Sequence, residues 1–177
     1  MDAMLIGSAN DIAYAIATDV GGSIQVFTSF MNSRAKALGL HGTHFVNPHG
    51  LHDGNHYSTA RDISKLFLAA MEDPWIAESL GKKNAEIEVF APPPSQGDAG
   101  ESYTVTNTNP LLGLDGCVAG KTGFTTAAGR CLAAMFERDG KRLAVIVLGS
   151  PSEEALLTDV RAVVSAALEE LNRLQSL

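Results

Sequence analysis

The segment CVAGKTGFTTAAGRCLAAMFERDGKRLAVIVLGS, residues 117–150, decides the fold of this chain. Its apolar runs at 131–136 and 143–148 are separated by Asp139-Gly140, a dipeptide that accepts the positive φ angles of a tight two-residue turn. From Cys117 onward the pattern predicts strand, turn, strand, turn and strand. A three-stranded antiparallel unit is therefore expected here.

Helical periodicity flanks this segment on both sides. One helix is expected over residues 10–20, a second from Ser23 to Gly39, a third from about Thr59, which has capping-box spacing to Asp62, and a last one from Ser152. The apolar side chains expected to face inward are Ile12, Ala13, Ile16, Ala17 and Val20 in the first helix, Val26, Phe27, Phe30, Met31 and Leu38 in the second, and Leu156, Val160, Val163, Val164, Leu168 and Leu171 in the last.

The middle of the chain shows strand patterns in place of helical periodicity. After a short turn around Trp75, residues 86–89 alternate acidic and apolar side chains with the period of a strand, a Pro-rich loop covers 92–100, and another strand surrounds Tyr103. At 177 residues the chain suits one domain. We expect an α+β, α/β/α-like fold with a helical part at 1–82, followed at 83–177 by antiparallel strands packed by the C-terminal helix.

Composition excludes several classes of partner. The net charge of −7 leaves no basic surface for nucleic acid. The longest apolar runs are strand-length, far short of the roughly 20 residues that cross a bilayer. The first residues, MDAMLIGSAND, show no signal peptide.

Two groups of potential metal or redox residues each leave two interpretations open. The first is the set of histidines at 41, 44, 49, 52 and 56, which forms a metal site or a loop whose imidazoles bond backbone carbonyls. Glycine and proline interrupt that run, which favours the loop. Cys117 and Cys131 form a disulfide if the hairpin is symmetric about Phe124, and are buried thiols otherwise.

Two distant tripeptides carry the chemistry: Ser8-Ala9-Asn10 at a helix start and Lys121-Thr122-Gly123 on a strand before a hairpin. In this order they resemble the second and third motifs of the penicillin-recognising serine enzymes. The flanks LIGSANDIAYAIA, ALGLHGTHFVNPHGLHDGNHYSTARDIS, NTNPLL and GKTGFTTAAGRCLAA are similar to the D-alanyl-D-alanine carboxypeptidases, the low-molecular-mass penicillin-binding proteins. The resemblance covers nearly the whole chain and implies a β-lactamase-like transpeptidase fold.

The resemblance assigns a substrate-binding role to four residues. The family acts on peptidoglycan stem peptides ending in D-Ala-D-Ala and is acylated by β-lactams. Lys121 and Thr122 match the positions that bind the terminal carboxylate. Gly123 would let the substrate backbone lie along the strand. The N–H of Phe124 matches half of the oxyanion hole, and Phe124 itself replaces a histidine found in some members.

Catalytic roles follow in the same way. Ser8 matches the residue that relays a proton to the leaving D-alanine, and Asn10 matches the amide that bonds substrate and orients the catalytic lysine. These roles require the Lys121 ammonium and the Ser8 hydroxyl to face one groove. No cofactor or metal is needed for acyl transfer by serine.

One family element lies outside the resemblance. The nucleophile of the family stands in a Ser-x-x-Lys motif ahead of Ser-x-Asn, whereas only seven residues precede Ser8. Ser33-Arg34-Ala35-Lys36 and Ser79-Leu80-Gly81-Lys82 match the bare pattern but follow Ser8. We therefore expect a truncated member that is inactive by itself. The alternative is a non-catalytic remnant that binds D-Ala-D-Ala ends or a partner.

Three further expectations concern ancestry, location and assembly. A class A β-lactamase is excluded because its deacylating glutamate lies between the two motifs, whereas the similar string Glu169-Glu170-Leu171-Asn172 lies in the last helix. The resemblance implies an extracytoplasmic location, in the periplasm or cell wall. Apolar surface at Ile12, Ile16, Leu66 and Phe67 and an open strand edge predict a homo-oligomer.

Overall fold

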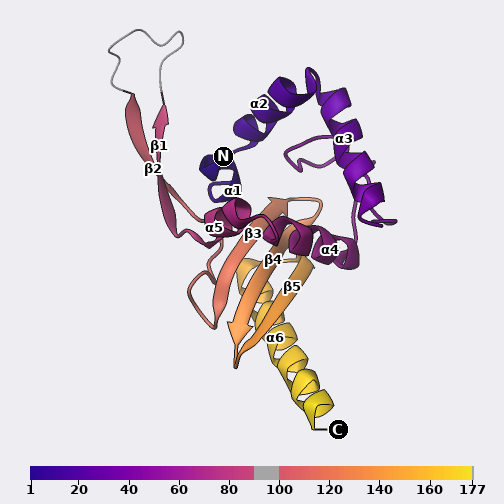
Figure 1. Cartoon of the computed structure of the whole chain (residues 1–177), viewed down its shortest axis with the longest axis vertical. Coiled ribbons are helices and arrows are strands. Elements are labelled where there is room, and N and C mark those ends of the chain that lie inside the picture. Colours follow the sequence, from indigo (N-terminus) through magenta and orange to yellow (C-terminus); the bar gives the residue numbers. More distant parts are fainter. Residues whose placement is uncertain (90–99, 177) are drawn as a thin grey trace.

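A computed structural model describes residues 1–89 and 100–176 of the chain. The elements in chain order are α1 (Asp2–Leu5), α2 (Asn10–Gly21), α3 (Ile24–Ala37), α4 (Ala60–Met71), α5 (Pro74–Gly81), β1 (Asn84–Val89), β2 (Glu101–Thr106), β3 (Cys117–Thr125), β4 (Gly129–Arg138), β5 (Lys141–Ser150) and α6 (Glu153–Gln175). Figure 1 shows α4 and α5 on one side of the β3–β5 sheet and α6 on the other, with α2 and α3 forming an arch beside them.

The central sheet has the predicted hairpin topology. Its strand order is β3-β4-β5, and both pairs are antiparallel. Asp139 and Gly140 have φ angles of 52° and 70°, the left-handed values that a tight turn with this dipeptide requires. The sequence prediction of an Asp-Gly hairpin between β4 and β5 is therefore confirmed.

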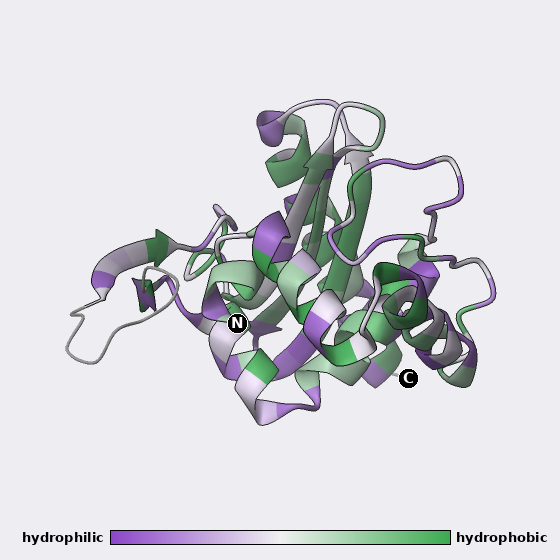
Figure 2. Ribbon diagram, turned by 90° about the horizontal axis from the view of Figure 1, so that it is seen from above, coloured by the Kyte–Doolittle hydropathy of each residue, from purple (hydrophilic) through white to green (hydrophobic). Residues whose placement is uncertain are grey.

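The three layers follow from the alternation of side chains along the strands. One set of strand side chains packs against α6, and the opposite set packs against α4 and α5. The α6 side of the core contains Leu132, Ala134, Phe136, Val145, Val147, Leu156, Val160, Val164 and Leu168, and the opposite side contains Phe67, Leu80, Ala119 and Met135. Figure 2 shows the strands of this sheet as mainly hydrophobic. The α/β/α-like arrangement agrees with the expected fold class.

A second, two-stranded sheet projects from the body of the molecule (Figure 1). β1 pairs with β2 in antiparallel register, with Ile87 opposite Tyr103. The predicted strands at 86–89 and around Tyr103 are confirmed. Of the predicted Pro-rich loop at 92–100, only Gly100 belongs to the described residues.

Helix starts agree with the predicted caps because each capping side chain accepts a free backbone N–H. Ser23 accepts from Val26, Thr59 from Asp62, and Ser152 from Ala155. The helix expected over residues 10–20 is α2, and it ends where Gly22 adopts a left-handed φ of 70°.

Two short helices depart from the prediction. The expected turn around Trp75 is the two-turn helix α5, because Pro74 occupies its first position and Asp73 caps the N–H groups of Trp75 and Ile76. α1, which the sequence patterns did not reveal, is four residues long and lacks a side-chain cap.

Several burial predictions are wrong. Val20, Val26, Phe30 and Val163 were expected to face inward and are 62%, 43%, 52% and 43% exposed. Val160 and Val164 belong to the buried face of α6, whereas the side chain of Val163 lies outside that face. Phe67, expected at the surface, is 6% exposed because it packs against Ala119 and Met135. The homo-oligomer stays a prediction. The exposed apolar side chains that could mediate it lie on α2 and α3, because Phe67 is buried.

The cysteine and histidine alternatives are resolved by the register and the loop contacts. Cys117 lies opposite Phe136 and Cys131 opposite Gly123, so the hairpin is not symmetric about Phe124 and the alternative of two thiols holds, with Cys117 buried and Cys131 partly buried. Within residues 1–89 and 100–176, no group of three His, Cys, Asp or Glu side chains could hold a metal ion.

Three of the histidines bond backbone instead. His44 donates from Nδ1 to the Asn55 carbonyl at 2.6 Å, whereas Nδ1 of His49 and of His56 accepts a backbone N–H. The loop interpretation therefore agrees with the structure, although two of the rings accept where carbonyl bonding was expected. In the described part of the chain, every helix is too short or too polar to cross a bilayer.

Candidate active site

Lys121 lies in the middle of β3, the strand at one edge of the described sheet. Its Nζ donates to Ser8 Oγ at 2.7 Å and to the carbonyl oxygen of Thr122 at 2.8 Å. Burial lowers the pKa of this ammonium from 10.5 to about 8, because a charged group loses hydration there. Lys121 therefore stays mostly charged at neutral pH but gives up its proton more readily than an exposed lysine.

Ser8 is brought to Lys121 by the short segment between α1 and α2. Its backbone has φ 59°, a left-handed conformation uncommon for a residue with a side chain. Asn10 is the first residue of α2, two positions later. Both residues belong to the helical part of the chain. Ser8 lies 113 positions before Lys121 in the sequence.

The remaining Lys-Thr-Gly residues continue along β3. Thr122 Oγ1 hydrogen-bonds Thr108 Oγ1 at 2.5 Å. A Cβ added at Gly123 would meet nothing within 4 Å, so the strand presents bare backbone at this point. Phe124 follows with its side chain 61% exposed.

These residues share one cavity of about 650 Å³. All six residues that the resemblance singled out line it: Ser8, Asn10, Lys121, Thr122, Gly123 and Phe124. The required geometry, a lysine ammonium and a serine hydroxyl facing one groove, is therefore present. The arrangement can bind an anionic group and move a proton between Ser8 and Lys121.

The structure adds charged residues that the sequence patterns did not single out. Arg130 lies opposite Phe124 on β4, with its guanidinium 5.1 Å from the ring centroid. Its Nη1 is 3.6 Å from the carboxylate of Glu153 at the start of α6. Both residues line the same cavity. Sequence spacing could not reveal Arg130 and Glu153, because the register between β3 and β4 brings the first to the cavity and the placement of α6 brings the second.

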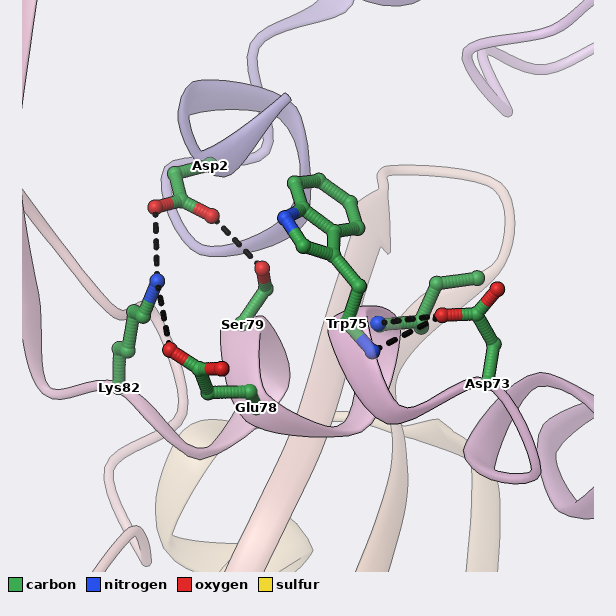
Figure 3. Close-up of polar contacts among 7 residues, drawn as sticks. Asp2, Asp73, Trp75, Glu78, Ser79 and Lys82 are labelled. Carbon is green, nitrogen blue, oxygen red and sulfur yellow. Dashed lines mark hydrogen bonds and ion pairs between the residues drawn. The ribbon is translucent and has the colours of Figure 1, made fainter.

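The two Ser-x-x-Lys sequences of the chain lie elsewhere. The Ser33 hydroxyl donates to the Ser29 carbonyl within α3. Ser79 is fully buried in α5, where its hydroxyl donates to Asp2 at 2.7 Å (Figure 3). Lys82 is engaged with the same carboxylate. Neither pair lines the cavity.

Known proteins of similar sequence are D-alanyl-D-alanine peptidases. The chain is 36% identical over 148 residues to the D-alanyl-D-alanine endopeptidase of Escherichia coli, covering 81% of this chain and 44% of that protein. It is 34% identical to a D-alanyl-D-alanine carboxypeptidase of Mycobacterium tuberculosis, covering 84% of this chain and 48% of that protein. The chain thus spans about half the length of these curated relatives.

Solved structures show the same fold. The Streptomyces K15 DD-transpeptidase superposes with a TM-score of 0.85 at 30% identity, covering 93% of this chain and 64% of that one. The Francisella tularensis D-alanyl-D-alanine carboxypeptidase superposes with a TM-score of 0.81 at 28% identity, covering 94% and 50%. The D-alanyl-D-alanine carboxypeptidase family model matches residues 1–152. Ser8 and Lys121 both lie within that match, and this chain belongs to the D-alanyl-D-alanine carboxypeptidase family.

Proposed function

We propose that this chain forms part of the active site of a serine-type D-Ala-D-Ala carboxypeptidase that trims peptidoglycan stem peptides and is bound by β-lactams. The observation that carries the proposal is the 2.7 Å contact between Lys121 Nζ and Ser8 Oγ inside a cavity lined by both motifs. Its place of action is extracytoplasmic, where the wall substrate lies. The helical part at 1–82 and the sheet part at 83–177 each contribute one motif.

Substrate binding is proposed along β3. The terminal carboxylate of D-Ala-D-Ala is held by the Lys121 ammonium and the Thr122 hydroxyl, and Arg130 adds a second positive charge to the cavity. The peptide backbone lies beside Gly123, where no side chain intervenes, and pairs with the strand edge as an added strand. The N–H of Phe124 faces the oxygen of the scissile carbonyl.

Proton transfer is proposed to run through Ser8. When the peptide bond breaks, the leaving D-alanine amine needs a proton, and the Ser8 hydroxyl passes one on while Lys121 replaces it. Because the pKa of Lys121 is lowered to about 8, the ammonium gives up a proton near neutrality more readily than an exposed lysine. Asn10 supplies an amide that hydrogen-bonds the substrate.

Binding of a D-Ala-D-Ala peptide is expected to weaken above pH 8. Carboxylate binding favours the charged form of Lys121, so the pKa of the complex lies above the value of about 8 in the free chain. Affinity is then full below pH 8 and falls by up to about tenfold per pH unit above it. Isothermal titration calorimetry with an N-acyl-D-Ala-D-Ala peptide between pH 6 and 10 measures this.

The matched control for this pH dependence is Lys121→Arg. Arginine keeps its charge throughout the range, so its affinity profile is expected to be flat from pH 6 to 10. A wild-type profile that is equally flat would contradict the role assigned to Lys121.

The second candidate function is binding without covalent chemistry. It is favoured by one observation: neither Ser-x-x-Lys pair of the chain lies in the cavity. Incubation with a fluorescent penicillin followed by denaturing electrophoresis distinguishes the two functions. We expect this 177-residue chain to remain unlabelled, because a stable label requires a serine that is acylated.

The outcomes of the penicillin experiment are separable. A covalent label on the wild-type chain that disappears in Ser8→Ala would show that Ser8 itself is the nucleophile and would overturn its role as a proton relay. A label that disappears instead in Ser33→Ala would show that Ser33, an exposed residue of α3, is the nucleophile. A label that appears only when a segment carrying a Ser-x-x-Lys motif is supplied would support the peptidase, whereas reversible peptide binding with no label in either case supports the binding function.

A further inference from the structure

Ser8 adopts a backbone conformation that its surroundings must impose. Its φ of 59° falls in the left-handed region, and such conformations cost about 1–3 kcal/mol unless the neighbouring structure determines them. The reach of the Ser8 hydroxyl to Lys121 Nζ depends on this conformation. What holds the segment before Ser8 therefore also sets the geometry of the site.

The segment before Ser8 is held by backbone hydrogen bonds to α1 and to Thr108, which lies between β2 and β3. The N–H of Ala9 donates to the carbonyl of Ala3 in α1 at 3.1 Å, and the carbonyl of Ile6 accepts the N–H of Thr108 at 3.1 Å. Ile6 is fully buried. The position of α1 thus determines where Ser8 lies.

α1 needs an anchor of its own. A four-residue helix is far too short to be stable alone. Asp2, its first residue, accepts a hydrogen bond from Ser79 at 2.7 Å through one carboxylate oxygen and from Lys82 at 3.2 Å through the other (Figure 3). The bond from Ser79 and the nearby Lys82 lower the pKa of the Asp2 carboxyl, so it is ionised at neutral pH.

α5, the helix that carries Ser79, is packed against β3, the strand that carries Lys121. Leu80 of α5 is 3% exposed and packs in one cluster with Ala119 of β3. A Cβ added at Gly81 would lie 3.0 Å from the carbonyl oxygen of Val118, so the end of α5 lies against the β3 backbone. α5 and β3 consequently form one packed unit.

We propose that Asp2 is a positioning residue: through Ser79 and α5 it ties the segment that carries Ser8 to the strand that carries Lys121. The two sides of the cavity are 113 residues apart along the chain, and this hydrogen bond connects them by a short path. The inference rests on the proposed function for its catalytic meaning. Its primary test uses the chain without ligand and is therefore independent of that function.

The test is the titration of Lys121 in Asp2→Ala, followed by NMR of the lysine Cε resonances. In the wild type, burial keeps the pKa of Lys121 at about 8. When α1 is released, Ser8 and its neighbours no longer cover the ammonium and water reaches it. The pKa is expected to rise by about one unit or more toward that of a hydrated lysine. Asp2→Asn, whose amide oxygen still accepts from Ser79, is expected to keep the wild-type value.

Two further variants keep the test decisive. Ser79→Ala removes the same hydrogen bond from the other side and serves if Asp2→Ala does not fold; it is expected to raise the pKa in the same direction. Asp159→Ala is the matched control, because Asp159 accepts an equivalent bond from buried Ser150 at 2.8 Å between α6 and β5. It is expected to lower the melting temperature without moving the pKa of Lys121.

The outcomes separate this proposal from the proposed function. An unchanged Lys121 pKa in folded Asp2→Ala or Ser79→Ala, or an equal rise in Asp159→Ala, would overturn the positioning role. If the wild-type chain fails to bind an N-acyl-D-Ala-D-Ala peptide while Asp2→Ala raises the Lys121 pKa and Asp2→Asn does not, the positioning role stands and the peptidase assignment fails.

Discussion

Lys121→Ala is expected to weaken binding of an N-acyl-D-Ala-D-Ala peptide about 100-fold. The substitution removes the ammonium that the cavity offers beside Ser8, and a hydrogen bond to a charged group contributes about 1.5–3 kcal/mol, with each 1.4 kcal/mol equal to a tenfold change in affinity. The measurement is isothermal titration calorimetry at pH 7, with the same peptide carrying either a free carboxylate or a terminal amide.

The two peptides make the role of the charge specific. The wild type is expected to prefer the carboxylate over the amide, whereas Lys121→Ala is expected to bind both equally weakly. Lys36→Ala, which removes an exposed lysine from α3, controls for the change in net charge and is expected to keep the preference. If Lys121→Ala still favours the carboxylate by the wild-type factor, another group binds it, and Arg130 is then the first residue to substitute.

Phe136→Ala is expected to have the largest effect on stability, lowering the free energy of unfolding by about 3–5 kcal/mol. Phe136 is 1% exposed in the cluster between β3–β5 and α6. Removing its ring leaves a cavity in the middle layer of the fold. Because domains of this size are stable by only about 5–15 kcal/mol, the midpoint of urea unfolding should shift far toward lower concentrations.

Phe124→Ala is the matched control for Phe136→Ala. The same side chain is removed from a position that is 61% exposed, and surface substitutions of this kind change stability by about 0.5 kcal/mol or less. The backbone N–H assigned to the oxyanion hole is retained. Equal losses of stability in the two variants would show that the layer between the sheet and α6 is not the main core.

Helix starts and the central hairpin could be predicted because their causes are local. Ser23, Thr59 and Ser152 each satisfy N–H groups within three residues of themselves, and Asp139-Gly140 determines its own turn. Burial was less predictable, because periodicity identifies an apolar face without showing whether anything covers it. Val26 and Phe30 have the helical spacing of core residues and are nonetheless exposed on α3.

The residues of the site were recognisable as two motifs, but their meeting was not visible in the sequence. The order of elements, the antiparallel meander and the six motif residues follow from local chemistry and from a resemblance that extends along the chain. Only the tertiary structure places Ser8 Oγ 2.7 Å from Lys121 Nζ, brings Arg130 and Glu153 into the same cavity, and joins Asp2 to Ser79. The reason is physical: these contacts depend on how helices and strands pack, and packing across more than a hundred residues leaves no periodicity or spacing in the chain.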